Sequence, residues 1–158
     1  INAMVGRTGL AKTSSTPGRT RLLNWFRVTP ARGKDLHIVD LPGYGYAKVP
    51  KAMRDSWRPM IEDYLMGREA LIGMVLLIDA RRGVRDEEAS LVAWLLEREL
   101  PVVVVLTKAD KLPKSKRKLV QTTVRKELGL QRAPIVTSAA KGDGLSELWQ
   151  AVVAMTKR

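Results

Sequence analysis

Three polar clusters in the sequence directly follow runs of apolar residues. They are Asp40-Leu41-Pro42-Gly43 after LHIV, Thr107-Lys108-Ala109-Asp110 after VVVVL, and Thr137-Ser138-Ala139 after Ile135-Val136. In open α/β sheets, ligands bind at the loops that leave the carboxyl ends of the strands. The placement of the clusters therefore predicts one shared ligand site, and their side chains indicate the chemistry of that site.

The second cluster has the chemistry to recognise a guanine base. Guanine presents its N1 proton and its 2-amino group side by side, so the Asp110 carboxylate can accept both hydrogen bonds, whereas adenine lacks this donor pair. The methylene stem of Lys108 can lie over the base plane while its ammonium group holds a neighbouring loop. The third cluster offers backbone amides and a hydroxyl for the guanine carbonyl oxygen. Each string alone is also compatible with an ordinary solvated loop.

The first cluster suits magnesium and a terminal phosphate. A carboxylate at Asp40 can hold magnesium through water, and the Gly43 amide can approach a phosphate without obstruction by a side chain. Upstream, the segment TPGRT at 16–20 contains two threonines whose hydroxyls could reach the same ion. A terminal phosphate can order such a loop, and hydrolysis can release it. By itself, each of these two segments is also compatible with an ordinary turn. Only the order of the clusters along the chain favours a nucleotide site.

Residues 6–13, GRTGLAKT, nearly match the phosphate-binding pattern GxxxxGK[ST], with Ala11 in place of the second glycine. A phosphate loop must leave a buried strand and open into a helix whose N-terminus faces the anion. Pro17 and Gly18 follow Thr13 within five residues, which leaves no room for that helix. We therefore reject this segment as a phosphate loop.

The elements that must position the clusters alternate between strands and helices. Arg21 to Val28 and Leu36 to Asp40 are typical of two antiparallel strands. Met74 to Ile78, Val102 to Leu106 and Ile135–Val136 are typical of parallel strands that are covered on both faces. Helical stripes join them at Trp57, Ile61 and Leu65; Leu91 and Leu95; Val120, Val124 and Leu128; and Leu145, Leu148, Trp149 and Val152. This alternation predicts an open, mostly parallel α/β sheet with helices on both faces.

Composition narrows the class of protein. The length of 158 residues and the hydrophobic content of 45% fit a single compact domain. The lack of cysteine excludes disulfides and thiolate metal sites, and His37 is the single histidine. No apolar run is long enough for a membrane helix, so we expect a cytoplasmic protein. The formal charge of +12 indicates either a nucleic-acid partner or a solubilising surface, and the charge alone favours neither.

Five stretches together resemble the bacterial EngB (YihA/YsxC) GTPase family. They are TSSTPGRT at 13–20, DLPGYGYAKVP at 40–50, LLIDARRG at 76–83, LTKADKL at 106–112 and SAAKGDGLSELW at 138–149. DLPGYGYAKVP is the most specific of them. The resemblance implies a P-loop NTPase fold of the Ras-like G-domain type, present as one domain over residues 1–158. It also implies a monomeric GTPase that binds GTP or GDP and Mg²⁺ and acts with the large ribosomal subunit or its RNA. The family is associated with ribosome biogenesis, cell division and septation.

Carried onto this sequence, the resemblance assigns nucleotide contacts to four segments. They comprise Gly18, Arg19, Thr20, Arg21 and Leu22; Asp40, Leu41, Pro42 and Gly43; Thr107, Lys108, Ala109 and Asp110; and Thr137, Ser138 and Ala139. Thr20, and Asp40 through water, are the implied magnesium ligands. The hydrolytic residue stays unassigned, because Tyr44 stands where Ras-like proteins carry a glutamine.

In the same alignment, residues 1–4 continue the helix that follows the phosphate loop. We therefore expect the first strand and the phosphate loop in about 30 further residues upstream in the natural protein, counting one strand, one loop and a helix start. The chain by itself is expected to bind GTP poorly and to be inactive. The alternative is a non-enzymatic RNA-binding scaffold with a GTPase-like fold.

RNA contact is predicted for basic residues that follow the nucleotide loops, with a solvated helix surface as the alternative. They are Arg81, Arg82, Arg85, Lys111, Lys114, Lys116, Arg117 and Lys118.

Overall fold

The computed structural model describes residues 1–12, 23–30, 35–41 and 51–157, with residues 51–58 described as helical backbone only. The chain divides into two compact units. One unit comprises Ile1–Leu10 with Ile72–Arg158, and the other comprises Ala11–Leu71. Each unit has its own sheet.

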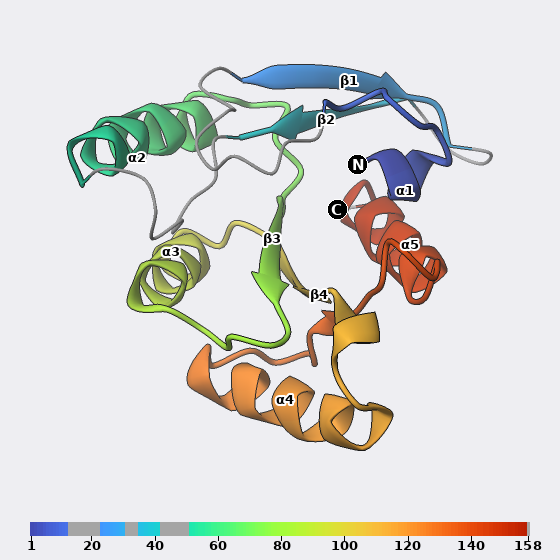
Figure 1. Ribbon diagram of the computed structural model, residues 1–158. Coiled ribbons are helices and arrows are strands. Elements are labelled where there is room, and N and C mark those ends of the chain that lie inside the picture. Colours follow the sequence, from blue (N-terminus) through green and yellow to red (C-terminus); the bar gives the residue numbers. More distant parts are fainter. Residues whose placement is uncertain (13–22, 31–34, 42–50, 158) are drawn as a thin grey trace. The chain divides into compact units, whose positions relative to one another are not determined.

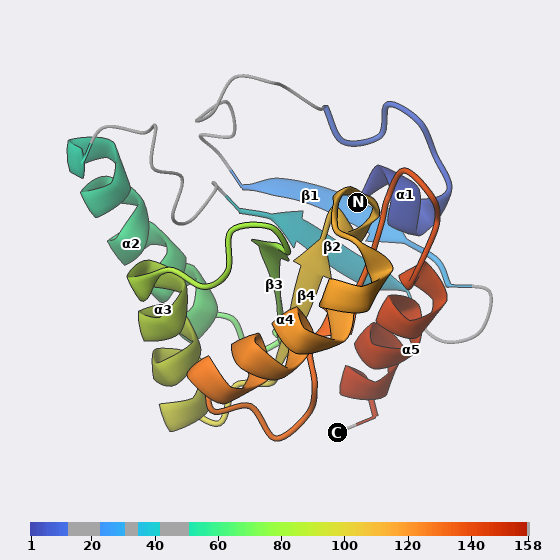
Figure 2. The ribbon, with the colours of Figure 1, turned by 60° about the horizontal axis from the view of Figure 1, so that its bottom comes forward.

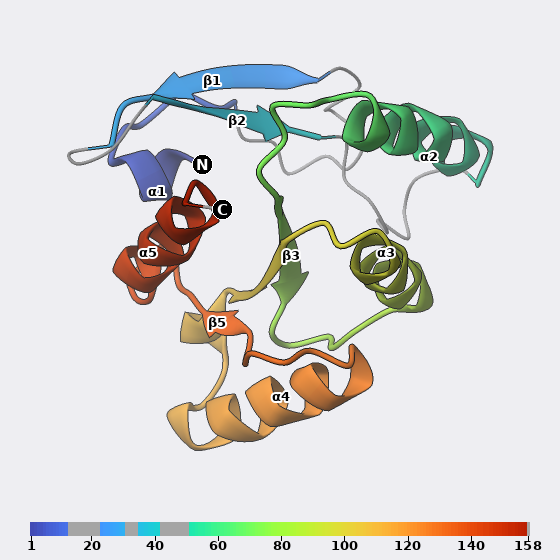
Figure 3. The same ribbon diagram turned by 180° about the vertical axis from the view of Figure 1, so that it is seen from behind.

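The larger unit contains a parallel sheet in the order β3-β4-β5. Its strands are β3 (Met74–Asp79), β4 (Val102–Thr107) and β5 (Ile135–Val136). Its helices are α1 (Asn2–Val5), α3 (Asp86–Glu97), η1 (Ala109–Lys111), α4 (Lys114–Glu127) and α5 (Leu145–Met155). Helices α3 and α4 cover one face of the sheet, and α5, with α1 beside it, covers the other (Figures 1 and 3). The predicted parallel strands with helices on both faces are therefore confirmed in this unit.

The core of this unit lies between the sheet and its helices. Ile78 and Val105 in neighbouring strands are completely buried, as is Leu95 of α3. Val124 of α4 and Leu148 of α5 are buried as well, and both belong to the helical stripes predicted from sequence. Burial of this apolar surface is the main contribution that orders the strands whose ends carry the polar clusters.

The smaller unit contains an antiparallel pair of strands and one helix. Strand β1 (Asn24–Val28) pairs with β2 (Leu36–Asp40) in a register that places Asn24 opposite Asp40. Helix α2 (Lys51–Met66) buries Ile61 and Leu65, two members of its predicted stripe. Trp25 of β1 packs edge-on against Tyr64 of α2 at 5.9 Å between ring centroids.

Three details differ from or sharpen the sequence-based expectation. The five described strands form two sheets, where one open sheet was predicted. Strands β3 and β4 each run one residue further than predicted, and this extension brings Asp79 opposite Thr107 within the ladder. Residues 2–5 are helical, so GRTGLAKT does not follow a strand, and its rejection as a phosphate loop is confirmed.

None of the helices in the described ranges combines the length and apolar character needed to cross a bilayer.

Candidate functional site

The carboxyl ends of the three parallel strands lie next to one another. Strands β3 and β4 run side by side and end together (Figure 2). The Thr107 hydroxyl donates a hydrogen bond to the Ile78 carbonyl at 3.2 Å, which binds the end of β4 to β3. On the other side, the Thr137 amide donates to the Leu106 carbonyl at 2.8 Å, which binds the residue after β5 to β4. The second and third sequence clusters therefore occupy one edge of one sheet, as predicted.

Backbone geometry turns the chain sharply after β4. Lys108 adopts a left-handed conformation with φ of 57°, and η1 begins at the next residue. Ala109 is completely buried, and its amide donates to the Thr137 carbonyl at 3.0 Å. The buried alanine thus fixes the loop after β4 against the loop after β5. As a consequence, Asp110 lies beside Ser138.

Asp110 and Ser138 form the centre of the site. The Ser138 hydroxyl donates to Oδ1 of Asp110 at 2.7 Å, and the Lys141 amide donates to the same hydroxyl oxygen at 3.2 Å. The hydrogen bond from Ser138 lowers the pKa of Asp110, and the Lys111 ammonium, 3.7 Å from Oδ2, acts in the same direction. Asp110 is therefore ionised at neutral pH. Because each carboxylate oxygen has two lone pairs, both oxygens keep capacity for further donors.

Both donors of Ser138 have partners within the protein. Its hydroxyl has a single proton, and that proton is used on Asp110. Its amide donates to the Asp143 carbonyl at 3.0 Å. Ser138 is completely buried, whereas Ala139 next to it is exposed. Of this cluster, the exposed Ala139 is the residue whose backbone stays a candidate for the guanine carbonyl oxygen.

Gly144 closes the loop that carries Ser138. Its φ is +71°, and a Cβ atom on it would lie 2.1 Å from the Val136 carbonyl oxygen. Only glycine fits such an approach in the left-handed conformation without a shift of the backbone. The chain can therefore return to the end of β5 before α5 begins at Leu145.

Sequence reasoning missed the contribution of Asp79 to this site. Its Oδ1 and Oδ2 accept hydrogen bonds from the Arg81 guanidinium at 2.9 and 2.7 Å, and its Oδ2 lies 3.2 Å from Nζ of Lys108. The Arg81 hydrogen bond lowers the pKa of Asp79 far below the usual range. A signal was present in the sequence, since Asp79 follows an apolar strand just as the three clusters do.

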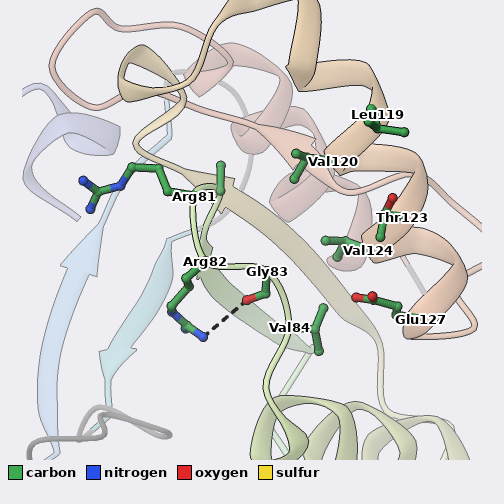
Figure 4. Close-up of a pocket in the computed structure, with 10 residues that line it drawn as sticks. Arg81, Arg82, Gly83, Val84, Leu119, Val120, Thr123, Val124 and Glu127 are labelled. Atoms are coloured by element: carbon green, nitrogen blue, oxygen red, sulfur yellow. Dashed lines mark hydrogen bonds between the residues drawn. The ribbon is translucent and has the colours of Figure 1, made fainter.

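A groove of about 390 Å³ lies between the loop after β3 and α4. Arg82, Gly83 and Val84 line it from the loop, and Leu119 and Val120 are among the α4 residues opposite (Figure 4). Glu88, with 1% of its side chain exposed, pairs with Arg82 and accepts the Arg85 amide at 3.0 Å, which fixes the loop to α3. The groove is separate from the Asp110 and Ser138 pair, because neither residue lines it.

The phosphate and magnesium side of the predicted site is described only in part. Asp40 ends β2 in the smaller unit, where burial raises the pKa of its carboxyl group. Leu41 follows it directly. The predicted contacts at Gly18, Arg19, Thr20, Arg21, Leu22, Pro42 and Gly43 lie outside the described residues. Within the described ranges, no three His, Asp or Glu side chains gather in a metal-binding group.

Comparisons with known proteins bear directly on this arrangement. Residues 1–108 match the family described as 50S ribosome-binding GTPase. Residues 61–158 match the elongation factor Tu GTP binding domain. The chain is 46% identical to the probable GTP-binding protein EngB of Anaeromyxobacter dehalogenans strain 2CP-C, over 98% of this chain and 74% of that protein. It is 41% identical to the protein of the same name from Geobacter sulfurreducens, with the same two coverages.

The chain belongs to the EngB family of GTP-binding proteins.

Solved structures show that this EngB-family chain has the G-domain fold of P-loop GTPases. A crystal structure of a probable GTP-binding protein engB matches with a TM-score of 0.75 and 19% identity, over 99% of this chain and 91% of that one. Era in complex with MgGDPNP and a segment of 16S ribosomal RNA matches with a TM-score of 0.78 and 22% identity, over 98% of this chain and 50% of that one. At these identities the likeness concerns the fold.

Proposed function

We propose that this chain is the guanine-recognising part of a GTP-driven switch that acts in assembly of the large ribosomal subunit. The observation that carries the proposal is the ionised Asp110 carboxylate, which Ser138 holds at the edge of the parallel sheet. A carboxylate fixed in this way can accept the paired N1 and 2-amino donors of guanine. Membership of a family described as ribosome-binding GTPases supports the choice of partner.

The proposal also assigns roles to the other predicted site residues. Lys108 supports the base with its methylene stem, and Ala139 donates its amide to the guanine carbonyl oxygen. Thr20, and Asp40 through water, would hold magnesium, whose charge offsets that of the phosphates. Changes in the segments 16–20 and 44–50 then report the nucleotide state to the ribosome. Since Tyr44 replaces the water-positioning glutamine, we expect slow intrinsic hydrolysis that the ribosomal partner or a monovalent cation accelerates.

Exposed lysines on α4 support an RNA contact. Lys114, Lys116 and Lys118 are exposed near the start of the helix. Four of the other predicted RNA contacts have carboxylate partners within the protein: Arg81 pairs with Asp79, Arg82 with the buried Glu88, Lys111 with Asp110, and Arg117 with Asp143. The three lysines are therefore our choice for phosphate contacts.

Nucleotide binding tests the proposal most directly. Fluorescent GDP and GTP are titrated with magnesium into this chain, the protein at its natural full length, and full-length Asp110→Asn. We expect the full-length protein to bind guanine nucleotides, this chain to bind them weakly, and Asp110→Asn to prefer xanthine nucleotides. The preference changes because the amide of asparagine can donate to the extra carbonyl of xanthine. Asp143→Asn, at a half-exposed carboxylate, is the matched control. Lack of binding by every form would leave the RNA-binding scaffold as the function.

RNA binding is tested through its dependence on salt. The full-length protein with Lys114, Lys116 and Lys118 changed to Glu is compared with the wild type for binding to large-subunit RNA between 50 and 300 mM salt. If these lysines neutralise phosphates, the slope of log affinity against log salt falls by about 0.7–0.9 for each phosphate that the variant no longer neutralises. The same slope in both proteins would mean that this part of α4 is only a solvated surface.

A further inference from the structure

Asp79 accepts interactions from two cations at the guanine-recognising edge. Arg81 donates to it three times, through its amide at 3.1 Å and through Nε and Nη2. Nζ of Lys108, the residue directly after β4, lies 3.2 Å from Oδ2 of Asp79. The Asp79 side chain is 16% exposed, whereas that of Lys108 is 55% exposed. An anchored carboxylate thus holds the tip of an otherwise exposed lysine.

We infer that Asp79 is a positioning residue for guanine-nucleotide binding, which acts by holding the side chain of Lys108 across the carboxyl ends of β3 and β4. The inference rests on the proposed function, because it assigns a part to a residue behind the same base site. It adds a residue outside the three polar clusters, and it makes the order of the lysine stem depend on a carboxylate in the neighbouring strand.

The backbone at both ends of this ion pair is fixed. Asp79 is the last residue of β3 and lies opposite Thr107 in the ladder, directly before Lys108. Lys108 is held in the left-handed conformation by the turn into η1. With both backbones fixed, the ion pair leaves the four-carbon stem of the lysine little freedom. The stem therefore runs from a fixed backbone to the fixed Asp79 carboxylate, two residues from Asp110, and our proposal is that a base bound to Asp110 contacts it.

Arg81 makes the carboxylate a rigid partner. Its guanidinium spans both Asp79 oxygens, so the carboxylate plane cannot rotate freely. The Arg81 side chain extends away from the α4 side chains of the groove (Figure 4). The hydrogen bonds to Asp79 raise the pKa of Arg81, and the negative charges of Asp79 and, to a smaller extent, Asp110 act in the same direction.

The ion pair would favour nucleotide binding by ordering the Lys108 side chain in advance. A free lysine side chain has many rotamers, and a ligand that packs on it must order them. The ion pair orders the stem before the nucleotide arrives, so less binding free energy is lost. Asp79→Asn keeps the size of the side chain but removes the charge that attracts Lys108.

A double-mutant cycle in the full-length protein tests this inference. The Kd for GDP is measured for the wild type, Asp79→Asn, Lys108→Met and the double variant. We expect Asp79→Asn to weaken binding about fivefold to tenfold, as for removal of one charge-assisted hydrogen bond. The double variant is then expected to bind as Lys108→Met does, because Asp79 acts through the lysine. Glu97→Gln, in the exposed pair with Arg98, is the charge-removal control and should not change the Kd.

A second route does not depend on the folding of the Asp79 variant. Arg81 is half exposed, and Arg81→Gln loosens the carboxylate without touching the core. Arg81→Gln should weaken GDP binding about twofold to threefold when it is introduced into the wild type. It should have no effect when it is introduced into the Lys108→Met variant, as expected for coupled residues. Additive effects in both cycles, or an unchanged Kd for Asp79→Asn, would overturn the inference while the proposed function stands. Failure of the wild type to bind GDP would overturn both.

Discussion

The hydroxyl of Ser138 donates a hydrogen bond of 2.7 Å to Oδ1 of Asp110, 28 residues earlier in the chain. This bond joins the loop after β4 to the loop after β5, and Ser138 is completely buried beneath it. Two segments that are each also compatible with an ordinary loop in the sequence thereby form one structural unit. The bond holds the Asp110 carboxylate, which we propose as the base-recognising group, in one position, and such preorganisation lowers the cost of binding.

The first prediction concerns this hydrogen bond. Ser138→Ala removes the donor to Asp110 and the acceptor for the Lys141 amide, so polar groups at a buried position lose a partner. We expect the Tm to fall by about 2–4 °C for a chain of this size and guanine-nucleotide binding to weaken about tenfold. Thermal unfolding and GDP titration measure the two effects. Ser146→Ala, at an exposed serine in α5, is the control and should change neither. Retention of both properties in Ser138→Ala would show that the hydrogen bond contributes nothing.

The second prediction concerns acid stability. The pKa of Asp110 is lowered in the folded protein by Ser138, so its contribution to stability is present above the unfolded value of about 3.9 and is lost as the pH falls through the folded value. Ser138→Ala brings the two values closer together. We therefore expect the wild type to lose more stability than Ser138→Ala when the pH is lowered from 5 to 2. Urea unfolding at a series of pH values measures this, and parallel curves would contradict it.

The third prediction concerns Gly144. A Cβ atom there would lie 2.1 Å from the Val136 carbonyl oxygen at a φ of +71°, so Gly144→Ala must shift the loop that carries Ser138. We expect a loss of at least about 2 kcal/mol of stability, from strain in addition to the left-handed conformation. Gly142→Ala is a close control, because Gly142 has a φ of +75° but no atom within 4 Å of the added Cβ. It should lose only about 1 kcal/mol. Equal losses by urea unfolding would mean that the close approach is not costly.

The fourth prediction concerns the buried pair of Glu88 and Arg82. Glu88 is 1% exposed, so Glu88→Ala leaves Arg82 and the Arg85 amide without this partner in a mostly buried position. We expect a loss of about 3 kcal/mol, the usual result of removing one member of such a pair. Glu97→Ala removes a carboxylate that is 76% exposed and should change stability by less than about 1 kcal/mol. The two variants are compared by urea unfolding, and similar small losses in both would argue against a structural role for the pair.

Most of the fold in the larger unit was predictable from sequence. The apolar, β-branched strands follow from periodicity, and the structure places them within one residue of the expected bounds. The predicted helical stripes lie on α3, α4 and α5. The placement of Asp110 and Ser138 at one edge was predictable for the same reason, because parallel strands bring their carboxyl ends together. By contrast, the sequence-based prediction ended β3 at Ile78, and it did not include the pairing of Arg81 with Asp79.

The sequence by itself therefore determined much of the apolar core, the parallel strands and the side chains that we propose for guanine binding. These properties depend on local periodicity and on the chemistry of single residues. The tertiary structure decided the partners: the Ser138 hydroxyl donates to Asp110, and Lys108 reaches Asp79 in the neighbouring strand. The physical reason is that hydrogen bonds and ion pairs require separations of about 3–4 Å, and only strand register and a loop closed by Gly144 set those separations.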